Sequence, residues 1–115
     1  MPTNQEVRAK WIFGTAPSGE SGSVTGSTGT GTRITFHGNA REIIVHLETD
    51  AACTCSYQVL ASRTLTGPTI VLSSGTLNTS ALDIVHLTGP WLQVFPRCKT
   101  INSTGNAFIV ELVGN

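Results

Sequence analysis

The cysteines are the residues with the clearest potential for chemistry. Cys53 and Cys55 are two residues apart, and Cys98 follows much later in the chain. On a β-strand, residues two apart share a face, so these two thiols could bind one metal ion or oxidise to a disulfide. A zinc site would need more ligands, such as Cys98 with His46 or His86, but structural zinc sites more often use Cys-x-x-Cys spacing. Because cysteine is often buried as a small apolar residue, we expect buried free thiols and neither metal nor cofactor.

The histidines and carboxylates form no recognisable catalytic motif. His37, His46 and His86 each alternate with apolar neighbours in or beside a predicted strand, as structural or surface histidines do. The segment 22–26 resembles the Gly-x-Ser-x-Gly nucleophile motif but has Val24 in place of the serine. Nothing selects a glycosidase pair among the carboxylates Glu42, Glu48, Asp83 and Glu111. We therefore expect that the protein is not an enzyme.

Two other groups of residues suggest ligand binding. Gly26, Gly29 and Gly31 resemble a phosphate-binding loop, but such a loop opens a helix, and the residues that follow have a strand pattern. Aromatic side chains near a sheet edge could stack on sugars, although core packing is their usual role. The aromatic candidates are Trp11, Phe13, Tyr57, Trp91 and Phe95. Of these, Trp91 directly follows Gly89-Pro90, which favours a place at one end of the domain, where ligands often bind.

Charge and composition narrow the possible partners. Seven basic residues balance seven acidic ones, whereas nucleic-acid-binding proteins usually carry a basic excess. We also expect no membrane contact, because no basic amphipathic stretch and no long apolar span occurs. The N-terminus lacks the pattern of a secretory signal and the cysteine count is odd, so we expect synthesis in a reducing cytoplasm.

The elements that must position these residues are strands. Ser, Thr and Gly recur between short β-branched runs that alternate with period two. The expected strands are 7–13, 33–37, 41–49, 53–60, 68–73, 82–87, 91–97 and 106–113. Turns are expected at Gly38-Asn39, Gly67-Pro68, Gly89-Pro90 and residues 104–106, and Gly75 is expected to mark a bulge or a strand break. Residues 41–49 could also form a short helix, but their β-branched residues favour a strand. About eight short strands separated by turns predict an all-β protein, a single antiparallel β-sandwich that is jelly-roll-like.

The alternation also predicts which side chains form the core. The expected core residues are Ile34, Phe36, Ile43, Val45, Leu47, Tyr57, Val59, Leu72, Leu92, Val94, Phe108, Val110 and Leu112.

The chain divides into three regions of one domain. Residues 33–115 form the sandwich body, residues 14–32 a Gly/Ser/Thr-rich loop or linker, and residues 1–13 an N-terminal strand or arm. An extended arm would place Val7, Trp11 and Phe13 on one face, which must pack on its own sandwich or on a partner. We hypothesise that these three residues, together with Trp91, contact a partner, and that deleting residues 1–13 leaves the sandwich folded but weakens attachment.

The second half of the chain resembles a known group of proteins. A series of strand patterns begins at Ile43. Gly89-Pro90-Trp91 then precedes the strand pattern Leu92-Gln93-Val94-Phe95-Pro96-Arg97, and residues 106–113 form a closing strand. This order is similar to that of the jelly-roll capsid decoration proteins, also called cement or staple proteins, of tailed bacteriophages.

The resemblance implies a role and a location. It implies a non-enzymatic structural protein of the virion that binds between shell subunits as a homo-oligomer, with the major capsid protein or another virion protein as its partner. The alternative is a phage tail or fibre module, or another β-sandwich that binds carbohydrate.

Overall fold

The protein is built from strands. The computed structural model describes residues 6–14, 23–24, 28–50, 53–102 and 107–115, apart from the side chains of 23–24 and 37–39. Within these ranges there is no helix, so residues 41–49 are a strand and the predicted all-β class is confirmed. No helix capable of crossing a membrane occurs in the described part of the chain.

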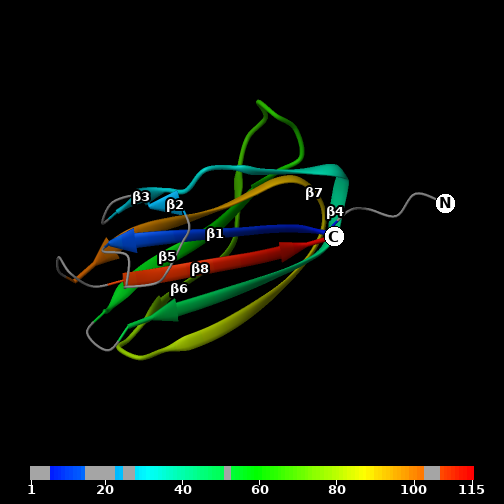
Figure 1. Ribbon diagram of the computed structural model, residues 1–115. Coiled ribbons are helices and arrows are strands. Elements are labelled where there is room, and N and C mark those ends of the chain that lie inside the picture. Colours follow the sequence, from blue (N-terminus) through cyan, green and yellow to red (C-terminus); the bar gives the residue numbers. More distant parts are fainter. Residues whose placement is uncertain (1–5, 15–22, 25–27, 51–52, 103–106) are drawn as a thin grey trace.

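The described residues form eight strands, which Figure 1 labels. Their bounds are β1 Val7–Gly14, β2 Ser23–Val24, β3 Gly29–Thr30, β4 Ile34–Thr49, β5 Cys55–Ser62, β6 Ile70–Leu77, β7 Leu82–Ile101 and β8 Ala107–Gly114. The described part of the Gly/Ser/Thr-rich region thus contains the two short strands β2 and β3. The predicted turn at residues 104–106 and most of the predicted linker lie outside the described residues.

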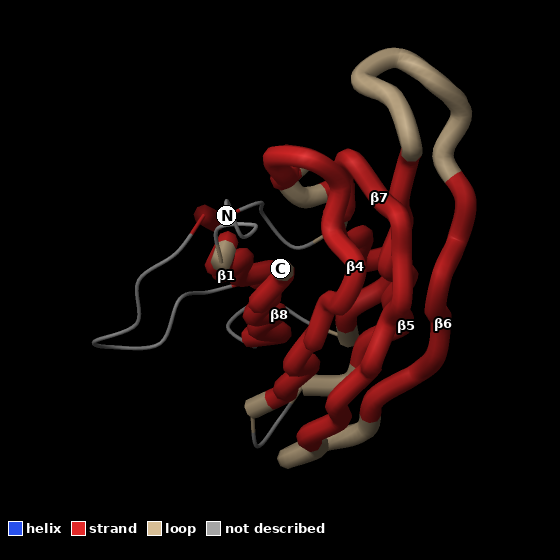
Figure 2. Tube along the Cα trace, turned by 90° about the vertical axis from the view of Figure 1, so that its right-hand side faces the viewer, coloured by secondary structure: helices blue, strands red, loops and turns tan. Residues whose placement is uncertain are grey.

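Strand pairing produces two layers that share β4 and β7. One layer has the order β2-β1-β8-β4-β7, to which β4 contributes residues 42–49 and β7 residues 82–88. The other has the order β4-β7-β5-β6, using residues 34–35 of β4 and residues 93–101 of β7, and β3 also pairs with β7. In Figure 2, β1 and β8 lie apart from β5 and β6, with β4 between them. The pairs are antiparallel except for β1 with β2, and the arrangement is the predicted antiparallel β-sandwich-like fold.

The two long strands differ from the shorter ones predicted. Gly38-Asn39 and Gly89-Pro90 were expected to be turns that end strands, but the chain passes through both within β4 and β7. The register between these strands shifts on both sides of Ala40. A side chain at Gly89 would meet the carbonyl oxygen of Ala40 at 1.9 Å, so only glycine allows the two backbones to approach this closely. These positions are corners at which each strand passes from one layer to the other.

The core lies between the layers and largely matches the predicted alternation. Its largest buried members on the predicted positions are Phe36, Ile43, Val45, Leu47, Tyr57, Val59, Val94, Phe108, Val110 and Leu112. Ile34 and Leu72 pack against this cluster while partly exposed, and Leu92 is half-buried. Gly75, expected to mark a bulge or break, lies within β6 opposite Tyr57, whose hydroxyl would be 3.1 Å from an added Cβ.

The N-terminal segment is a strand of the sandwich. β1 pairs with β8 along its whole length, from Val7 opposite Gly114 to Gly14 opposite Ala107. Trp11 and Phe13 are only 1% and 0% exposed, and the indole Nε1 of Trp11 donates a hydrogen bond to the carbonyl of Thr32 at 3.1 Å. The expectation that Trp11 and Phe13 contact a partner therefore needs correction. Their side chains fill the protein's own core.

Candidate functional site

Of the four predicted contact residues, Val7 and Trp91 remain partly accessible, and Trp91 is the one that borders an open pocket. It lies at the corner of β7 that Gly89-Pro90 begins, and it is half-buried. Its Nε1 donates a hydrogen bond to the carbonyl of Thr88 at 2.9 Å, which fixes the orientation of the ring. An indole held in this way binds a ligand at a low cost in side-chain entropy.

Arg63 covers part of this ring from a different segment. It belongs to the loop between β5 and β6, and its guanidinium carbon lies 5.5 Å from the centroid of the Trp91 ring. That distance is within the range of a cation–π interaction. Arg63 is exposed, and no carboxylate pairs with it within the described ranges. The guanidinium therefore retains hydrogen-bond donors for a ligand or partner.

These two residues belong to an open pocket, which we call the Trp91 pocket. Its volume is about 300 Å³, at the small end of ligand-binding cavities. The lining consists of Ala61, Ser62, Arg63, Thr64, Pro68, Ile70 and Trp91. The wall is mainly apolar, with the guanidinium and two hydroxyl groups as polar elements. It suits an apolar group that stacks on the indole beside a carboxylate or hydroxyl that bonds Arg63.

The other aromatic candidates are closed to ligands. Trp11, Phe13 and Tyr57 are core residues. Phe95 lies on the outer side of β7 but is only 3% exposed, because Arg33 stacks 4.7 Å from its ring centroid. Val7 is half-buried and packs on the core.

Exposed apolar side chains are the feature that sequence reasoning missed. Leu65, Ile70 and Val71 are 62%, 48% and 47% exposed and belong to the pocket loop and the start of β6. Leu82 and Ile84 are 65% and 50% exposed on β7. In the sequence, the apolar run at residues 70–72 was the available signal for these exposed side chains. An edge strand has fewer neighbouring strands, so its apolar side chains are less buried.

The three cysteines are buried free thiols, as predicted. Burial, followed by the nearby thiols, raises the pKa of Cys55 to about 12 and that of Cys98 to about 11. Burial, followed by the Asp50 carboxylate, also raises the pKa of Cys53. Thiols held in the neutral form are poor nucleophiles and poor metal ligands. Among the described residues, no three His, Cys, Asp or Glu side chains are arranged to hold a metal ion.

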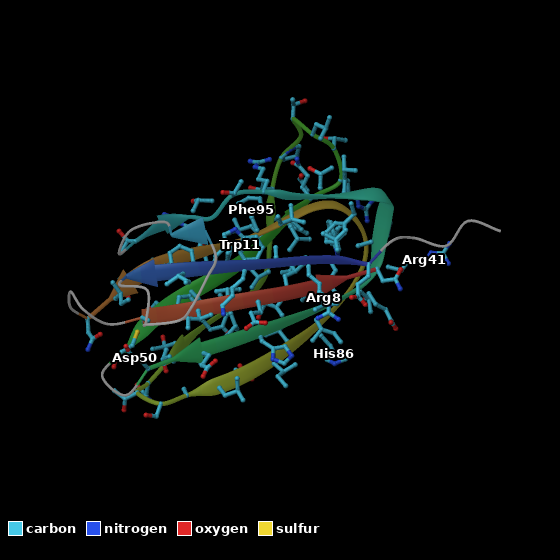
Figure 3. All side chains as sticks on the ribbon, viewed as in Figure 1. Arg8, Trp11, Arg41, Asp50, His86 and Phe95 are labelled. Carbon is cyan, nitrogen blue, oxygen red and sulfur yellow. The ribbon has the colours of Figure 1, made fainter. Side chains whose placement is uncertain are left out.

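The histidines do not join the thiols. His46 and His86 are exposed on β4 and β7, where they face Ile84 and Ile44 respectively across the strand pair. Figure 3 shows His86 at the surface. The side chain of His37 lies outside the described residues.

Comparison with known proteins adds no relative. No family model, curated protein or solved structure matches the chain.

Proposed function

We propose that this chain is a non-enzymatic attachment module that decorates a phage capsid, binding between shell subunits through the Trp91 pocket. The observation that carries the attachment role is the pocket itself. It combines an anchored, partly open indole with a guanidinium that has no carboxylate partner among the described residues. Tryptophan and arginine are the residues most often found at energetic centres of protein interfaces.

The chemistry of the pocket defines the partner surface. Its apolar wall favours an aliphatic or aromatic side chain, and Arg63 favours an acidic residue beside it. The exposed Ile70 belongs to the lining, and the exposed Leu65 lies in the same loop as Arg63 and Thr64. The choice of a capsid shell as this partner comes from the resemblance of the second half of the chain to decoration proteins.

Carbohydrate binding is the second candidate, and the same residue favours it. An accessible indole face is a common platform for sugar rings, and the exposed Thr64 lies in the same lining. Arrayed glycans separate the two functions. Capsid attachment predicts no glycan signal that depends on Trp91.

Co-sedimentation with empty capsid shells that lack this chain tests the proposal. We expect saturable binding that weakens about tenfold or more in Arg63→Ala and Trp91→Ala, because each substitution removes a central contact. Leu82→Ala is the matched control, since it removes an exposed apolar side chain on β7 outside the pocket lining. Equal binding by all three variants would contradict the assignment of the pocket, and no binding by the wild type would contradict the function.

A further inference from the structure

We propose that the free edge of β6 pairs with β6 of a second copy of this chain, antiparallel and about a twofold axis. The biological use of this pairing rests on the proposed attachment function, whereas the pairing itself does not. β6 is the last strand of its layer, with β5 on one side and no described strand on the other. Figure 2 shows its outer side uncovered.

The composition of β6 leaves this edge open to pairing. Natural edge strands are usually protected by charged side chains, by proline, by short length or by a β-bulge. β6 has eight residues, Ile-Val-Leu-Ser-Ser-Gly-Thr-Leu, with neither a charge nor a proline. A bulge at Leu72 interrupts the start of the strand, but Ser73 to Leu77 pair regularly with β5 and leave the rest of the edge regular. Ile70 and Val71 are about half exposed and would gain burial from a neighbouring strand.

Two other edges of the sandwich carry charges. The free edge at residues 82–88 of β7 carries Asp83, which takes a core-facing register position opposite Leu47 yet remains exposed. An inward-directed charge of this kind discourages strand addition. At the opposite end of that layer, β2 pairs with Trp11 and Ile12 of β1, and the rest of that edge carries Arg8 and Lys10. Compared with these two edges, Ser73 to Leu77 of β6 form an edge without a charge, a proline or a bulge.

A second copy fits this edge better than a charged foreign strand. A strand without charges gains no electrostatic complementarity from a charged partner, whereas an antiparallel copy opposes no like charges in any register. Twofold pairing also satisfies the free backbone groups of both edges at once and forms a closed dimer.

The dimer would place two binding sites at its opposite ends. Ile70 begins β6 and also lines the Trp91 pocket, so the pocket lies at the start of the strand. Antiparallel pairing puts the start of one strand beside the end of the other. A bivalent dimer of this shape could bridge two neighbouring shell subunits and gain avidity without stronger single contacts.

Light scattering on the purified full-length chain, across a range of concentrations and without capsid, tests the pairing. We expect a monomer–dimer equilibrium that Ser74→Lys weakens about tenfold or more, because it places like charges at the shared edge. Thr100→Lys adds the same charge at an exposed position of β7 and should leave the equilibrium unchanged. Circular dichroism confirms that both variants fold.

Hydrogen exchange identifies the surface that pairs. Backbone amides of β6 should become more protected as concentration rises, while those of residues 82–88 should not. A chain that stays monomeric, a dimer insensitive to Ser74→Lys, or protection confined to other strands would each overturn the proposal. These measurements need no capsid, so their failure is distinct from failure of the attachment function.

Discussion

The two tryptophans show how residues of one type take opposite roles. Trp11 is buried between β8 and Gly31, and a Cβ added at Gly31 would lie 2.8 Å from the indole. Trp91, by contrast, borders an open pocket. We expect Trp11→Ala to lower the free energy of unfolding by about 3–5 kcal/mol, because it leaves a large cavity. Trp91→Ala should cost far less. Denaturant titration followed by circular dichroism measures both, and equal losses would contradict the assigned roles.

The buried thiols predict a dependence of stability on pH. The folded state holds Cys55 neutral and raises its pKa from the ordinary value of 9.0 to about 12. Its contribution is complete below pH 9 and is lost as the pH rises from 9 towards 12, because the unfolded chain releases the proton first. The free energy of unfolding should therefore fall with pH above 9, and less steeply in Cys55→Ala. Parallel pH profiles for the two proteins would contradict this explanation.

At the scale of elements, β1 is a structural strand. It supplies Trp11 and Phe13 to the core and Ile12 to a second buried cluster with Ala107 and Ile109, and it pairs with β8 along its full length. Deleting residues 1–13 should expose that apolar surface and the edge of β8, and so prevent folding. This outcome differs from the expectation based on sequence, in which the truncated sandwich stays folded. A truncated chain with the β-type circular dichroism spectrum and cooperative melting of the full protein would contradict the structure.

The strands could be predicted from the sequence because alternation and burial agree locally. The two-residue spacing of Val45 and Leu47, and that of Val110 and Leu112, is enough to predict that these side chains face the core. The corners in β4 and β7 could not be predicted, because Gly89 resembles a turn residue until Ala40 is known to lie against it. The burial of Trp11 likewise depends on β8, which lies at the other end of the chain.

At the scale of the whole molecule, the candidate site depends on the sandwich. Arg63 and Trp91 are far apart in sequence and meet because β5 and β7 are neighbours in one layer. The sequence suggested Trp91 from its place after Gly89-Pro90, but it gave no reason to choose Arg63. The position of β6 at an open edge could not be predicted either, because a strand pattern does not show which strand ends a sheet.

The proposed function has the sandwich attach to a capsid shell by its Trp91 end. Cryo-electron microscopy of empty shells saturated with the chain would locate the bound sandwich. Attachment by this end predicts added density at the junctions between shell subunits, with the loop of residues 63–69 and Trp91 against the shell. Bare junctions, or a sandwich docked through the face that carries His46 and His86, would contradict it.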